Sequence, residues 1–230
     1  MHIGHEALLG CIAQRFPAAT EIEFHYNPYS SYDRDHLRQH VNRLAACMAV
    51  LPDGCWQTIR DYRARFEQLA PLAAHVGRLC PRLRSLAITC GEAEGAALMA
   101  ALRGLAAAAG TLRSLTLSVY LTCLEPGDAP RIAAALDKLT GLRGLGVSWD
   151  ARWPDDSAGL LAGALPSLTS LTSLEASCRT GDPRDPPQLG TRLEALRELS
   201  LLGDQRSPWA LGALHTAPQL PAITKMTLQG

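Results

Sequence analysis

The fold of this chain is decided by one short stretch, LCPRLRSLAITC at residues 79–90. Its apolar side chains stand at Cys80, Leu83, Leu86 and Ile88. The strict alternation after Leu86 places successive side chains on opposite faces of an extended chain. That alternation predicts a short strand with one buried face.

The same spacing of apolar residues recurs along the chain, and the clear copies start 25 to 30 residues apart. An early copy begins at Phe16. A weaker copy begins at Trp56 and Ile59, where Asp61 follows and the last apolar position is missing, so we expect irregular stacking there and in the proline-rich segment 181–187. The clear later copies begin at Ala109, Leu139, Leu168, Leu193 and Leu220.

A second pattern, typical of helices, fills the sequence between the predicted strands. Leu98, Leu102 and Leu105 have the i, i+4, i+7 spacing that places three side chains on one helical face. Asp128 stands before Pro130, which is a favourable helix start. Neither element can bury its apolar face alone, so the sequence predicts an α/β fold in which units of strand and helix stack as one domain over 1–230, with about 7–8 repeats. The same helical spacing recurs at Leu72, Val76 and Leu79, at Ile132, Leu136 and Leu139, and at Leu161, Leu165 and Leu168.

This repeated unit resembles the leucine-rich repeat, and its length is similar to the longer repeats of ribonuclease-inhibitor-like and F-box-associated proteins. Residues 79–88 are similar to the cysteine-containing repeat of the second group. The resemblance covers the chain from about Phe16 to Leu228. It implies a leucine-rich repeat solenoid, a right-handed α/β horseshoe arc with parallel strands on the concave side and helices on the convex side. Neither end shows a polar capping unit, so we expect a fragment, an incomplete gene product or a module that docks through its ends.

Composition narrows the classes of partner and the location. The 22 basic and 22 acidic side chains cancel, which excludes the basic surplus that nucleic acid or an anionic membrane surface requires. No apolar run is long enough to span a bilayer, and no signal peptide is evident at the start of the chain. The 7 cysteines form no Cys-x-x-Cys pair and are expected to be reduced thiols, so we predict a cytoplasmic or nuclear location.

The sequence offers no convincing catalytic or metal-binding set. His36 and His40 have a spacing that could hold a metal ion, but a third ligand is missing, and a solvated helix face is the better interpretation. Asp150, Asp155 and Asp156 fit no calcium loop. We therefore predict no enzyme activity, no cofactor and no metal, and we assign Cys80 to core packing.

Two rows of exposed residues are the candidate partner-binding surface. One row, a basic edge, holds arginines directly after the first leucine of the strand motif. The other is a strip of small hydroxyl side chains, and we expect stacking to align the two as adjacent rows on the concave face, with aromatic anchors just beyond the strands. Filling of exposed strand positions in an arginine-rich protein explains the same residues equally well. The residues are Arg84, Arg113, Arg143 and Arg197 for the first row, Thr89, Ser118, Ser148 and Ser177 for the second, and Tyr120 and Trp149 for the anchors.

Three functions follow as hypotheses. The first is a scaffold for protein–protein interaction that binds a partner protein through the concave strand face. The second, implied only by the resemblance, is the substrate-recognition part of an F-box type ubiquitin ligase, although no F-box segment precedes Phe16. The third is a regulator of a small GTPase, similar to the Ran GTPase-activating proteins.

Overall fold

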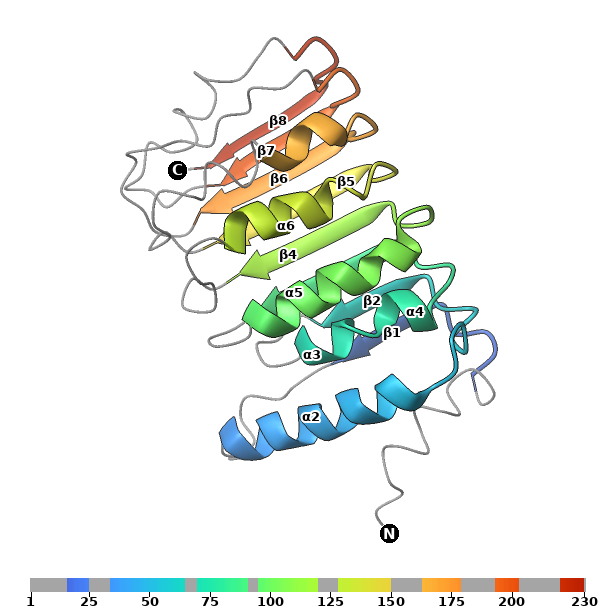
Figure 1. Cartoon of the computed structure of the whole chain (residues 1–230). Coiled ribbons are helices and arrows are strands. Elements are labelled where there is room, and N and C mark those ends of the chain that lie inside the picture. The colour runs from blue at the N-terminus through green and yellow to red at the C-terminus, as the bar shows by residue number, and fades with distance from the viewer. Residues whose placement is uncertain are drawn as a thin grey trace.

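The computed structural model describes residues 16–24, 34–64, 70–90, 95–119, 128–149, 163–178, 193–202 and 220–229. Within these ranges, eight parallel strands form one open sheet, and they follow one another in chain order (Figure 1). This arrangement confirms the predicted α/β class. The strands are β1 (Glu21–Phe24), β2 (Asp61–Ala64), β3 (Ser85–Cys90), β4 (Ser114–Val119), β5 (Gly144–Trp149), β6 (Ser173–Cys178), β7 (Glu198–Leu202) and β8 (Lys225–Gln229).

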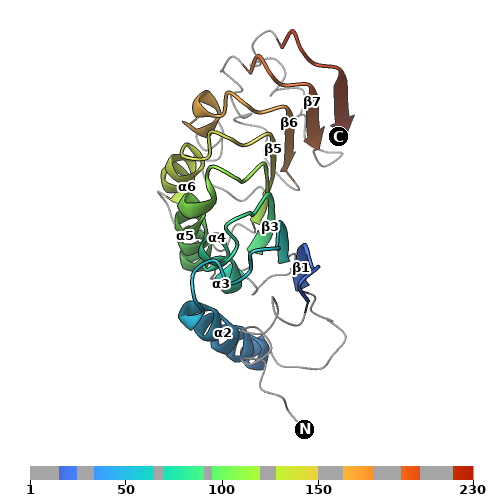
Figure 2. The same cartoon turned by 90° about the vertical axis from the view of Figure 1, so that its right-hand side faces the viewer.

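The helices lie along one side of this sheet (Figure 2). On the other side, no helix of the described ranges covers the strands, and we call that side the open face. The α-helices are α2 (Arg34–Val50), α3 (Ala70–Ala73), α4 (Val76–Leu79), α5 (Gly95–Gly104) and α6 (Asp128–Leu136), and the short 3-10 helices are η1 (Leu105–Ala108) and η3 (Leu165–Ser167).

The core lies between the sheet and the helices, where the apolar spacing predicted it. Leu86, Leu115 and Leu145 stand side by side in the register of β3, β4 and β5, and each is buried. The helical triplet Leu98, Leu102 and Leu105 is buried as well. Leucines from successive repeats therefore stack into one continuous apolar column, which no single repeat could bury alone.

The copy at Trp56 was wrongly predicted to be weak. Strand β2 places Tyr62 opposite Leu86 and Ala64 opposite Ile88, so the apolar spacing of this copy is complete. Trp56, Ile59, Tyr62 and Ala64 are at most 1% exposed, which is among the deepest burial in the chain. The prediction failed because tyrosine, with its polar hydroxyl, was not read as a core residue.

The apolar residues of the outer strands are less buried. Ile22 and Phe24 of β1 are half-buried, and Met226 and Leu228 of β8 are 47% and 45% exposed. In the described ranges β1 pairs only with β2, and β8 pairs only with β7. A residue with a stacking neighbour on one side only has fewer contacts than its counterpart in the middle of the sheet, so it is less buried.

Tyr62 carries a polar atom that the core does not satisfy. Its ring is fully buried and lies 5.7 Å from the ring of Phe24 between centroids, but its hydroxyl has no hydrogen-bond partner. Replacing Tyr62 with phenylalanine should raise the free energy of unfolding by about 1 kcal/mol, because an unpaired buried hydroxyl is destabilising. Urea unfolding measures the change, and a loss of stability would mean that the hydroxyl has a partner.

The same region should make the protein sensitive to alkali. Burial, and then the nearby Cys55 thiol, raises the pKa of Cys80 from 9.0 to about 12, and burial raises the pKa of Tyr62 well above 10. The unfolded chain releases these protons first, so stability should be constant below about pH 9 and fall as the pH rises from there towards 12. Urea unfolding across this range should show a shallower decline for Cys80→Ala and for Tyr62→Phe; an unchanged slope in both would contradict the assignment.

Arg78 joins helix α2 to the rest of the fold. Its Nη2 donates to the carbonyl oxygens of Met48 at 2.8 Å and Ala49 at 3.2 Å, and its Nη1 donates to the carbonyl of Leu51. The last carbonyls of a helix have no partner inside the helix, and a cation near them is stabilising. A bond from Nη1 to Asp53 Oδ1, at 2.7 Å, completes the set.

Replacing Arg78 with methionine should therefore lower the free energy of unfolding by about 1–3 kcal/mol, since charge-assisted bonds to several carbonyls are lost together. Limited proteolysis should then cut first within α2. Arg82→Met is the matched control, because Arg82 is exposed, and it should leave stability within about 0.5 kcal/mol. Equal effects of the two substitutions would show that the capping bonds contribute nothing.

Candidate functional site

The predicted arginine row exists, and it runs along the edge of the sheet where the strands begin. Arg84, Arg113 and Arg143 directly precede β3, β4 and β5. The backbone N–H of Arg113 donates to the carbonyl of Arg84 at 2.7 Å, and that of Arg143 donates to Arg113 at 2.8 Å. The sheet therefore holds these residues about 4.8 Å apart, one per strand.

Two further arginines belong to this edge, and neither was predicted from the sequence. Arg60 precedes β2, and its carbonyl accepts the N–H of Arg84 at 2.7 Å, which places it next in the row. It was overlooked because the copy at Trp56 was misread. Arg82 lies two residues before Arg84 and is exposed beside the row. We call Arg60, Arg82, Arg84, Arg113 and Arg143 the arginine edge.

Arg197 is in the same row but is separated from the arginine edge. Thr172 precedes β6 and takes the place of an arginine, with its N–H on the carbonyl of Arg143 at 2.8 Å. The N–H of Arg197 in turn donates to Thr172 at 2.8 Å. Glu198 follows at once, so the positive charge weakens towards β7.

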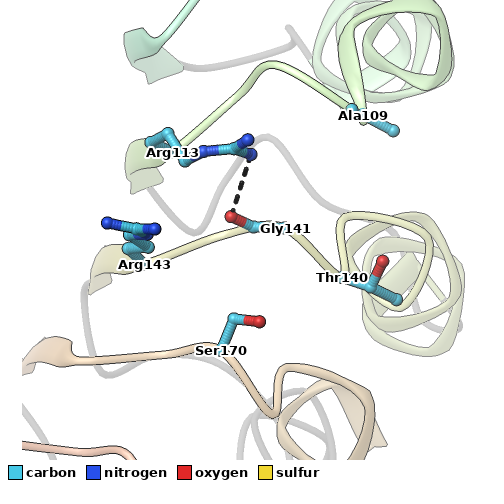
Figure 3. A pocket seen from close by; sticks show the side chains of 7 residues that line it. Ala109, Arg113, Thr140, Gly141, Arg143 and Ser170 are labelled. Carbon is cyan, nitrogen blue, oxygen red and sulfur yellow. Dashed lines mark hydrogen bonds between the residues drawn. The ribbon is translucent and has the colours of Figure 1, made fainter.

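The arginine edge surrounds a hollow of about 520 Å³. All five of its arginines line this hollow, together with Gly110 and Thr111. A second hollow of about 320 Å³ shares Gly110, Arg113 and Arg143 with the first and continues past Ser170 of the next repeat (Figure 3). The two hollows thus form one groove along the turns that lead into β2 to β6, beside the amino ends of these strands, and no strand residue lines either hollow.

Arg113 is fixed in this groove. Its Nη1 donates to the carbonyl of Leu112 at 3.1 Å and to that of Gly141 at 3.2 Å, the second bond reaching the next repeat (Figure 3). A Cβ at position 141 would lie 2.7 Å from the same Nη1, so glycine leaves the room for the guanidinium. Arg113 is half-buried, whereas the other members of the arginine edge are exposed.

No carboxylate neutralises the arginine edge in the described part of the chain. Ion pairs within 4.0 Å join Arg63 to Glu21, Arg78 to Asp53 and Arg131 to Asp128, and none involves a member of the edge. Like charges carried by four neighbouring strands repel one another. No ion pair in the described part of the chain offsets this repulsion.

The hydroxyl row is also in register, but it was wrongly predicted to lie beside the arginines. Thr89 pairs with Ser118, Ser118 with Ser148, and Ser148 with Ser177. These side chains are half-buried on the open face near the carboxyl ends of the strands. Thr89 comes five residues after Arg84, so about 16 Å of extended strand separates the two rows.

The aromatic anchors are not described. Tyr120 and the side chain of Trp149 lie outside the described residues, as do Asp150, Asp155 and Asp156. His40 is exposed on α2. Among the residues that the structure places, no group of three or more histidine, cysteine, aspartate or glutamate side chains is arranged to hold a metal ion.

Cys80 has the packing role that its place in the repeat predicted. It is completely buried, and its high thiol pKa keeps it protonated at neutral pH.

Among the described helices, none is both long and apolar enough to cross a membrane. The chain matches no model of a protein family, and no curated protein matches it.

Proposed function

We propose that the chain is a protein-binding module whose partner lies across the open face of the sheet. The observation that carries this proposal is the ordered row of arginines at the amino ends of β2 to β5, none of which is in an ion pair in the described part of the chain. A partner that crosses several strands meets an arginine at each of four successive repeats. Repetition of one contact is the way in which a stack of repeats binds an extended surface.

The side chains in the middle of the open face favour close approach. Ser85 and Ala87 of β3, Thr116 of β4 and Gly146 of β5 are small. They leave a flat surface on which a partner's side chains can pack, and the hydroxyl row supplies hydrogen-bond groups at its far border.

We infer further that the sheet and helices form a leucine-rich repeat solenoid and that the open face is its concave side. The parallel strands in chain order and the leucines in register support this assignment. The ubiquitin-ligase and GTPase hypotheses, and the cytoplasmic or nuclear location, stay predictions, because no described residue favours any of them.

A pair of matched substitutions tests the binding face. Thr116→Lys puts a long side chain in the middle of the open face, and Ala134→Lys puts the same side chain on the exposed surface of α6. Proteins that the wild-type chain captures should be lost with Thr116→Lys and kept with Ala134→Lys, as measured by quantitative affinity purification. Equal capture by the two variants would refute binding across the open face.

A further inference from the structure

We propose that the arginine edge binds an extended acidic segment of the partner, rich in aspartate and glutamate, which lies in the groove beside the amino ends of β2 to β5. This inference rests on the proposed protein-binding function and names the chemistry of the partner. It also assigns Arg60 and Arg82 to the contact, in addition to the arginines predicted from the sequence.

The shape of the arginine edge favours an extended chain over a compact ligand. From Arg60 to Arg143 the row crosses four strands, a span of about 14 Å. An extended peptide repeats a side chain on the same face about every 6.6 Å, so carboxylates at positions i, i+2 and i+4 cover about 13 Å. The groove continues beyond the row, past Arg143 to Ser170, which gives such a segment room to leave.

The type of charge also fits carboxylates. A guanidinium group can bind a carboxylate through two parallel N–H bonds, which the ammonium group of a lysine cannot do. The five positive charges of the arginine edge are all guanidinium groups. Four members are exposed, so each single pair contributes little, and affinity has to come from several pairs at once. Binding should therefore weaken steeply as salt is added.

A nucleic acid fits the site less well than an acidic peptide. The groove carries arginines and small residues, and none of the residues that line the two hollows is aromatic. Binding of single strands depends on aromatic side chains that stack on the bases. The formal net charge of zero also gives the chain no long-range attraction for a polyanion outside the edge.

The side chains of Arg84 and Arg143 in this interpretation serve binding and not the fold, so removing their charges should not destabilise the free protein. Arg84→Gln with Arg143→Gln removes two repelling charges and no ion pair. The double variant should melt about 1–3 °C higher than the wild type in low salt and equally in high salt. A lower melting temperature in low salt would mean that these side chains stabilise the fold, and it would overturn the proposal. Arg113 is left unchanged because it bonds to Leu112 and Gly141.

The decisive experiment titrates the full chain with three fluorescent probes. Two are twelve-residue peptides, one of alternating glutamate and serine and one of alternating lysine and serine. The third is a single-stranded oligonucleotide with the same charge as the glutamate peptide. The wild type should bind the acidic peptide and should not bind the lysine peptide. Its affinity for the acidic peptide should fall as salt is added. Arg84→Glu with Arg143→Glu should reduce that affinity at least about tenfold. Arg38→Glu with Arg43→Glu makes the same change of charge on exposed positions of α2, and it should alter the affinity less than about twofold.

The outcomes separate this inference from the proposed function. If the acidic peptide does not bind, or if the α2 variant loses as much affinity as the edge variant, the acidic-segment proposal is wrong. Tighter binding of the oligonucleotide would also overturn it. In each case the loss of partner capture by Thr116→Lys, with retention by Ala134→Lys, would still support binding across the open face. If Thr116→Lys captures the same proteins as the wild type, the proposed function fails, whatever the peptide does.

Discussion

Replacing Gly77 with alanine should lower the free energy of unfolding by about 3 kcal/mol or more, although alanine is the better helix former by about 1 kcal/mol. Gly77 lies in α4 and is buried against the end of α5. A Cβ at this position would lie 2.2 Å from the carbonyl oxygen of Gly104 and 3.3 Å from the Cα of Leu105. These atoms belong to the backbone, so the two repeats would have to move apart.

The contact is reciprocal, and the chain contains a matched control. A Cβ at Gly104 would lie 2.5 Å from the carbonyl oxygen of Ala74, so Gly104→Ala should be destabilising too. Gly110→Ala should change stability by less than about 0.5 kcal/mol, because nothing lies within 4 Å of its Cβ. Urea unfolding of the three variants measures the differences. If Gly77→Ala were as stable as Gly110→Ala, the close approach of the repeats would be refuted.

The strands were predictable because their signal is local and redundant. Leu86 and Ile88, Leu115 and Leu117 each alternate with polar or small residues, and the same spacing returns in later copies. A repeat that is hard to recognise alone becomes clear beside its neighbours. At Tyr62 the core position is occupied by a residue with a polar hydroxyl, so the copy at Trp56 was wrongly predicted to be weak. For the same reason Arg60, which belongs to that copy, was not predicted as a site residue.

The distance between the two rows could not be read from the repeats. The motif fixes which residues share a row, since equivalent positions stack in register. It does not say which border of the sheet a row follows until the start of each strand is known. Arg84 lies just before β3 and Thr89 lies near its end, so one row borders the groove and the other lies far from it. Contacts such as that of Arg78 with the end of α2 join residues about 30 apart, and no local pattern reports them.

A substitution in the middle of the leucine column tests the repeat architecture itself. Leu115 of β4 is completely buried, between Leu86 of β3 and Leu145 of β5. Leu115→Ala should lower the free energy of unfolding by about 2–5 kcal/mol, because it removes buried methyl groups and leaves a cavity. Thr116→Ala, one residue later and exposed, should cost less than about 1 kcal/mol. Chemical denaturation compares the two variants.

The location of the loss distinguishes a stack of repeats from a fold with one shared core. Each strand pairs only with its neighbours in the chain, so the effect of Leu115→Ala should decay along the stack. Hydrogen exchange should show faster opening of β3, β4 and β5, while the protection of β7 changes little. If every strand from β2 to β7 lost protection equally, stability would be shared across the whole chain. The arginine edge would then be held in register by that whole core, and a substitution in any repeat would disturb binding at β2 to β5.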